Sequence, residues 1–143
     1  MTCTDTSFLF SFYGNDAHSS RVADWLKSRS QAIIVSPLNR FELNNAFYLA
    51  DFRGTITSAA AESYRASFAA DIQQERLLMR KCSLHLLLKK AGQLSDQFTQ
   101  QGGHRAFDIL HVAAAIVFGA TEFLTFDIKQ RQLAEAAGLI VPL

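Results

Sequence analysis

The sequence predicts an α/β fold with a mostly parallel central sheet of four to five strands, flanked by helices in a three-layer α/β/α arrangement. Short apolar segments typical of buried strands alternate along the chain with longer segments in which apolar residues recur every three or four positions. Crossover helices return each strand in the same direction, so this alternation favours a parallel sheet. With 143 residues and no repeat or linker, residues 1–143 are expected to form a single domain.

The first third of the chain predicts two strands, each followed by a helix. Residues 1–4 form a short candidate strand that ends at Asp5, and the apolar run 8–13 follows. A helix with Asn15 or Asp16 as its cap is expected to end near Lys27. Residues 32–35 are a buried strand. The Ser36–Pro37 pair then predicts an N-cap and first helical residue, for a helix that continues to Arg53 and ends at Gly54.

The rest of the chain predicts mainly helices. One begins at Thr57 or Ser58 with a core-facing stripe, another covers about 84–98, and residues 101–103 form a loop. A buried apolar helix is expected at 105–118, and a strand at 123–126 ends at Asp127. A helix at 130–137 and a last strand at 139–141 complete the order.

Composition limits the classes of function. The formal charge of +1 balances 14 basic against 13 acidic residues, so contacts to nucleic acid must be local. Cys3 and Cys82 show no metal-ligand spacing, which fits a reducing cytoplasm. The most apolar stretch, 109–118, is too short to span a bilayer, so a soluble cytoplasmic protein is expected.

Two acidic residues are expected on apolar helix faces. A helical wheel places Glu42 with Leu38, Asn45, Leu49 and Phe52 on the side expected to face the core. An unpaired buried carboxylate costs several kcal/mol, so Glu42 needs a cation or a cleft. The alternative is a glutamate at the helix edge with its own arginine partner.

Asp108 lies on a helix that is apolar on almost every side. The alternative to a functional role is a first-turn aspartate favoured by the helix dipole and paired with Arg105 or His111. His111 itself is interpreted as a core histidine that hydrogen-bonds a backbone carbonyl, although it could also tune Asp108.

Asp5 and Asp127 each follow a predicted strand and precede a predicted helix, so each can be an N-cap. Four acids at strand ends or helix starts would gather at one edge of the sheet, where α/β folds bind ligands. Clustered carboxylates without Cys or His partners suit Mg²⁺ or Mn²⁺, and these ions indicate phosphate-containing substrates.

Four motifs in order give the chain a family resemblance. They are D-T-S at 5–7, S-P-L-N-R-F-E-L with its acid at 42, D-I-L-H-V-A-A-A from 108 and F-L-T-F-D ending at 127. The chain resembles the PIN domain, specifically the VapC toxins of type II toxin–antitoxin systems, over nearly its whole length. The polar first strand and Gly102–Gly103–His104 depart from the family pattern.

The resemblance implies a PIN-like fold and a metal-dependent endoribonuclease. Its catalytic and metal-binding acids would be Asp5, Glu42, Asp108 and Asp127, holding Mg²⁺ or Mn²⁺. Metal-bound water would cleave RNA to leave a 3′-hydroxyl and a 5′-phosphate. The residues expected to bind substrate are Thr125, Thr6, Ser7, Arg105 and Lys129, with Arg40, Arg53 and Arg131 as further candidates for phosphate contacts.

The resemblance also implies a cognate antitoxin and a homodimer, for which Trp25 and the 8–13 segment are either core or contact surface. Two alternatives stay open. A receiver domain would need paired acids after its first strand and an acid ending a middle strand, whereas Asp51 lies in a helical pattern. A PIN-fold module that binds RNA or protein without cleaving would keep the fold and lose the activity.

Overall fold

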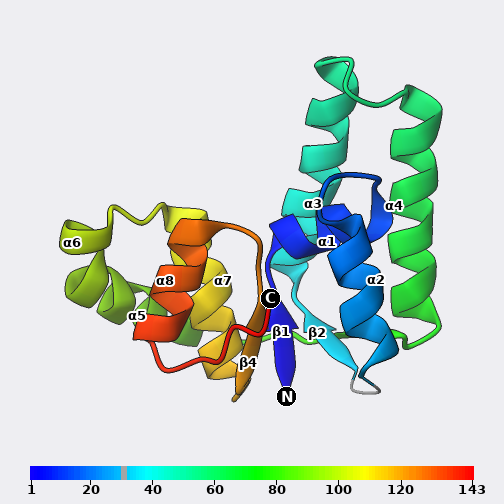
Figure 1. The fold of residues 1–143 in the computed structure, drawn as a ribbon. Helices are drawn as coiled ribbons and strands as arrows, with labels where there is room; N and C mark the ends of the chain where they lie inside the picture. The colour runs from blue at the N-terminus through cyan, green and yellow to red at the C-terminus, as the bar shows by residue number, and fades with distance from the viewer. Residues whose placement is uncertain (30–31) are drawn as a thin grey trace.

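The computed structural model describes residues 1–29 and 32–143 and contains a four-stranded parallel sheet (Figure 1). Its strands follow the order β3-β2-β1-β4, and every pair is parallel. Their bounds are Thr2–Thr4 (β1), Ile33–Val35 (β2), Leu77–Met79 (β3) and Glu122–Leu124 (β4). The predicted parallel α/β fold is therefore confirmed.

The strands differ from the prediction in two places. β3 was not predicted, because three residues at the sheet edge, flanked by Arg76 and Arg80, are too few to show an alternating pattern. The predicted last strand at 139–141 is reduced to one bridge between Ile140 and Glu122.

The helices begin and end mostly where the sequence predicts. Ser36 caps the longest predicted helix in a capping box with Asn39, Pro37 is its first residue, and Gly54 beyond its end has a φ of 71°. The helices are α1 (Thr6–Tyr13), α2 (Ser19–Lys27), α3 (Pro37–Phe52), α4 (Ser58–Gln73), α5 (Leu84–Leu94), α6 (Gln100–Gly102), α7 (Ala106–Val117) and α8 (Ile128–Ala136), with a π-helical turn η1 (Ser95–Thr99).

Several helices differ from the prediction. The apolar run 8–13, for which no helix was predicted, lies in α1, and α8 begins at Ile128 rather than at residue 130. The N-cap of α2 is His18 rather than Asn15 or Asp16, although the Asp16 carboxylate accepts a hydrogen bond from the His18 backbone N–H at 2.8 Å. Two residues of the predicted loop 101–103 are helical, because α6 covers Gln100–Gly102, and the left-handed Gly103 (φ 62°) ends that turn.

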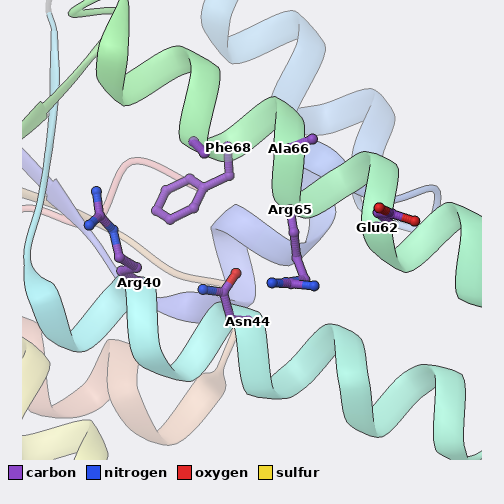
Figure 2. Close-up of a pocket in the computed structure, with 7 residues that line it drawn as sticks. Arg40, Asn44, Glu62, Arg65, Ala66 and Phe68 are labelled. Atoms are coloured by element: carbon purple, nitrogen blue, oxygen red, sulfur yellow. The ribbon is translucent and has the colours of Figure 1, made fainter.

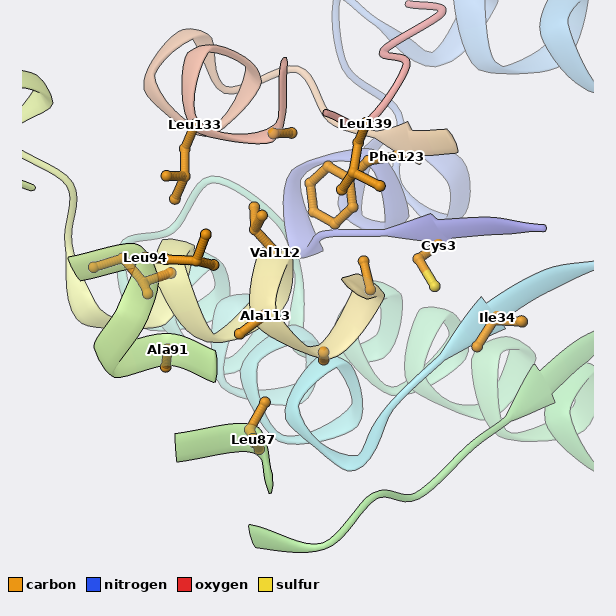
Figure 3. Close-up of a cluster of buried hydrophobic side chains, with 14 residues drawn as sticks. Cys3, Ile34, Leu87, Ala91, Leu94, Val112, Ala113, Phe123, Leu133 and Leu139 are labelled. Atoms are coloured by element: carbon orange, nitrogen blue, oxygen red, sulfur yellow. The ribbon is translucent and has the colours of Figure 1, made fainter. Parts of the chain in front are cut away.

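Two hydrophobic cores lie on opposite faces of the sheet, as the alternation of Ile33 and Ile34 between them shows. The core around Ile34 is closed by α5, α7 and α8, with Val112 and Phe123 fully buried (Figure 3). The other core is closed by α1 to α4 (Figure 1). Trp25 and Phe8 belong to this second core, so they are core residues.

The prediction of which side of α3 faces the core was wrong. Phe52 is 88% exposed and Leu49 is 38% exposed, whereas Leu43 and Phe47 are fully buried. Apolar residues lie on two sides of this helix, so a wheel cannot choose between them. α3 and α4 also project together beyond the sheet, where they pack against each other (Figure 1).

Among the described residues, the structure contains no helix with the length and apolarity that crossing a bilayer requires.

Candidate functional site

The parallel sheet brings all four predicted acids to one small cavity of about 120 Å³. Asp5 directly follows β1, Asp127 follows the neighbouring β4, Glu42 lies on the helix after β2, and Asp108 lies in the first turn of α7. The cavity is also lined by Thr6, Ser7, Arg105 and Gln130. Segments more than 100 residues apart in the sequence thus meet at the carboxyl edge of two adjacent strands.

Asp5 is the most buried of the four acids, with 2% of its surface exposed. It caps α1 by accepting the Phe8 backbone N–H at 3.0 Å, and it accepts the hydroxyl groups of Ser7 at 2.8 Å and Thr125 at 2.6 Å. Burial raises the pKa of Asp5 to about 6 even though these three donors lower it. The ionised Asp5 carboxylate is therefore destabilised by burial, and a cation beside it would stabilise it.

Glu42 is paired with a histidine rather than with the arginine considered as its alternative partner. Its carboxylate accepts a hydrogen bond from Thr6 and lies 2.7 Å from His111 Nε2. Partial burial raises the pKa of Glu42, but these two hydrogen bonds and the nearby Arg105 guanidinium together bring it below its ordinary value. His111 therefore does not bind a backbone carbonyl as predicted; its Nδ1 faces the Asn39 side-chain amide at 3.4 Å.

Asp108 and Asp127 share one arginine. Arg105 Nε lies 3.1 Å from Asp108, and Arg105 Nη2 lies 3.5 Å from Asp127. Asp127 also caps α8 by accepting the Gln130 backbone N–H at 2.9 Å. The capping and ion-pair roles considered as alternatives are both present, and they place these carboxylates on the cavity wall.

The predicted hydroxyl groups lie beside the acids. Thr125 is fully buried, donates to Asp5 and accepts the Asp127 backbone N–H at 3.0 Å. Ser7 donates to Asp5 and accepts the Phe126 backbone N–H at 2.9 Å. These bonds tie the end of β1 to the segment after β4.

The donor set fits a hard divalent ion in its chemistry, because carboxylate oxygens dominate the cavity. Across residues 1–29 and 32–143, no three His, Cys, Asp or Glu side chains stand together as a ready metal site. Arg105 and His111 instead contact three of the four carboxylates. A metal ion at this cavity would take the place of the Arg105 guanidinium beside Asp108 and Asp127.

The predicted basic residues do not all lie at this cavity. Arg105 does, whereas the exposed Lys129 has its ammonium group beside Gly103. Arg40 lines a different and larger cavity of about 430 Å³ between α3 and α4, together with Arg65 and Asn44 (Figure 2). Arg131 lies near Glu135 at 3.8 Å.

Sequence reasoning missed two positioning residues. The Asn39 side chain bonds Ser36, the Thr4 backbone carbonyl and His111, so it links α3 to β1 and α7. Its position three residues after Ser36 is the only sequence signal for this role. Gln130 is buried and donates to the Asp108 backbone carbonyl at 3.2 Å, which no local pattern reveals.

Comparison with known proteins gives the chain a family. The PIN domain model matches residues 2–136, while no curated protein matches the chain. Similar solved structures include VapC20 of Mycobacterium tuberculosis, a toxin described as cleaving the sarcin–ricin loop (TM-score 0.71, 18% identity, covering 98% of this chain and 97% of that one). FitAcB of Neisseria gonorrhoeae (0.64, 16%, 99% and 96%) and VapBC-1 of nontypeable Haemophilus influenzae (0.65, 15%, 98% and 95%) share the fold. This chain therefore belongs to the PIN domain family.

Proposed function

We propose that the chain is a metal-dependent endoribonuclease and the toxin component of a toxin–antitoxin pair. The observation that carries this proposal is the cavity at which Asp5, Glu42, Asp108 and Asp127 meet. The PIN family membership and the similarity of fold to VapC20, a toxin described as cleaving the sarcin–ricin loop, support it.

The proposed metal is Mg²⁺ or Mn²⁺, held by the four carboxylates. When bound, such an ion would supply Lewis acidity and lower the pKa of water for the hydrolysis of a phosphodiester bond. The raised pKa of Asp5 supports this role, because a nearby divalent charge would stabilise its ionised form.

The side chains around the acids have their own proposed roles. Thr125 and Ser7 fix the orientation of the Asp5 carboxylate, and Thr6 does the same for Glu42. Arg105 is 73% exposed in its side chain, so it can turn from Asp108 towards an RNA phosphate once a metal ion balances that acid. Lys129 is proposed to contact the RNA backbone further from the cavity.

The proposed partners are RNA, a cognate antitoxin and a second copy of the chain, within the cytoplasm. An exposed apolar stripe along α3 supports a protein partner, because monomeric proteins seldom leave such a surface in water. The stripe consists of Phe41, Tyr48, Leu49 and Phe52. Sedimentation velocity of the chain, alone and with the product of an adjacent small reading frame, would test both protein partners.

One observation favours a second candidate, a PIN-fold module that binds RNA without cleaving it. The ion pairs of Arg105 and the contact of His111 with Glu42 already satisfy three carboxylates in the described part of the chain. A module of this kind would bind RNA equally well with and without a divalent metal.

The experiment that separates the candidates is cleavage of labelled RNA by the purified chain with Mn²⁺, Mg²⁺ or EDTA. The ribonuclease proposal predicts cleavage that requires metal and is lost in Asp5→Asn and Asp108→Asn. Asp24→Asn is the matched control, because Asp24 is an exposed aspartate paired with Lys27 on α2. RNA binding without cleavage in any metal would favour the non-catalytic module.

A further inference from the structure

A second cavity opens beside the acidic cavity and shares part of its wall. Thr6, Ser7 and Asp127 line both cavities. The second one has a volume of about 390 Å³, and its other lining residues are Phe10, Ser11, Asp16, His18, Ala46 and Phe126. A ligand group in this cavity would therefore be a direct neighbour of a phosphate held at the four acids.

Aromatic rings form one wall of this second cavity. The His18 imidazole stacks on Phe126 with ring centroids 4.4 Å apart and 9° between the planes. Phe126 also stacks on the fully buried Phe8 at 6.1 Å, and its backbone N–H donates to Ser7. Phe126 thus connects the His18 ring both to the core and to Ser7 in the wall of the acidic cavity.

The His18 ring has no capping role. His18 is the N-cap residue of α2, yet its side chain makes no capping hydrogen bond, and in the described chain Phe126 is the only ring in contact with it. Its position on Phe126 at the cavity wall leaves a flat π-surface available to a ligand.

The charge of the second cavity favours a base over a phosphate. The Asp16 carboxylate accepts the Ser11 hydroxyl at 2.7 Å and the His18 backbone N–H at 2.8 Å. A carboxylate held in this way accepts further N–H donors and repels anions. Nucleobases offer N–H donors on their edges and a face that stacks on aromatic rings.

We propose that this second cavity binds a nucleobase of the RNA strand, stacked on His18, next to the phosphate at the acidic cavity. The proposal rests on the proposed ribonuclease function, and it assigns His18 and Asp16 to substrate selection. Stacking of one base on an aromatic side chain contributes roughly 5- to 150-fold in affinity.

An NMR titration tests the stacking directly and needs neither metal nor cleavage. Adenosine or ribose is added to the full chain while the ring protons of its four histidines, His18, His85, His104 and His111, are followed. His18→Phe and His85→Ala assign the signals. Adenosine should move the His18 signal through its ring current while ribose does not, and His85, exposed on α5, should stay fixed. No movement of His18, or equal movement with ribose, would overturn the proposal.

A second measurement uses a short single-stranded RNA and the same backbone without bases, with affinities from fluorescence anisotropy. The wild type and the matched control His85→Ala should prefer the base-carrying strand by about fivefold or more. His18→Ala should lose this preference and His18→Phe should keep it, because stacking needs the ring and not the charge. A preference that survives in His18→Ala would contradict the proposal.

The two proposals fail in different ways. A chain that prefers base-carrying RNA through His18 but cleaves nothing would refute the ribonuclease and leave the base site standing. Metal-dependent cleavage by a chain in which His18 contributes nothing to RNA affinity would support the ribonuclease and refute the base site.

Discussion

The carboxyl group of Asp5 lies among hydroxyl groups that donate to it, yet burial still raises its pKa to about 6. The folded-state pKa exceeds the ordinary value of 3.8, so the contribution of Asp5 to stability is present below pH 3.8 and is lost as the pH rises through about 6. The difference between the two pKa values corresponds to about 3 kcal/mol.

The effect of Asp5 on stability should depend on pH. In EDTA, Asp5→Asn should gain stability relative to the wild type by up to about 3 kcal/mol between about pH 4 and about pH 8, because the amide carries no charge to bury. Urea unfolding at the two pH values measures it, with Asp24→Asn as the exposed control. A difference that does not change with pH would show that Asp5 has an ordinary pKa.

The hydroxyl of Thr125 is the closest donor to Asp5, at 2.6 Å, and it is fully buried. Thr125→Val keeps the shape and removes the donor, so it should lower the free energy of unfolding near neutral pH by about 1.5–3 kcal/mol, the range for hydrogen bonds to charged groups. Thr121→Val, at an exposed threonine, is the control. Equal stability of the two variants would contradict the role given to Thr125.

At the scale of elements, α3 carries two apolar faces of which only one is buried. Phe47→Ala should cost about 3–5 kcal/mol because its ring is fully enclosed. Phe52→Ala, on the same helix, should change the free energy of unfolding of the monomer, at dilute protein, by less than about 0.5 kcal/mol because its ring is 88% exposed in the single chain. Urea unfolding at several protein concentrations compares them, and equal costs would mean that the exposed face is covered in solution.

The same helix shows what sequence patterns can and cannot predict. The start at Ser36–Pro37 depends on local backbone chemistry, so the sequence alone located it. Which face of α3 is buried depends on α4, the next helix along the chain, which packs on α3. No local sequence pattern contains that information. β3 was missed for the related reason that pairing with β2 defines it, whereas its own three residues do not.

The candidate site also combines features that local sequence predicts with features that depend on tertiary packing. Strand ends and helix starts are local features, so the positions of Asp5, Asp108 and Asp127 around one cavity were predictable, whereas Glu42 lines the cavity although the predicted core-facing side of α3 was wrong. The partners of these acids were not predictable, because the contact of His111 with Glu42 spans 69 positions and depends on how α7 packs beside α3.

At the scale of the whole molecule, the near-neutral charge of +1 means that the proposed RNA binding must depend on a few local contacts. If Arg105 and Lys129 make the two phosphate contacts, the logarithm of the affinity for single-stranded RNA should fall with that of the salt concentration with a slope of about −1.4. Arg105→Gln should bring this slope to about −0.7, while Lys89→Gln on α5 should leave it unchanged. Anisotropy titrations of Asp5→Asn measure it without cleavage, and a much steeper slope would indicate a basic surface elsewhere.

The most direct test of the central claim, that four carboxylates from separate elements form one metal site, is Mn²⁺ binding measured by electron paramagnetic resonance without RNA. The wild type and Asp24→Asn should bind Mn²⁺, whereas Asp5→Asn and Asp108→Asn should bind it at least about tenfold more weakly, because each removes one charged ligand. Mn²⁺ binding that is absent in the wild type, or that is unchanged in both cavity variants, would contradict the assignment of this cavity as the metal centre.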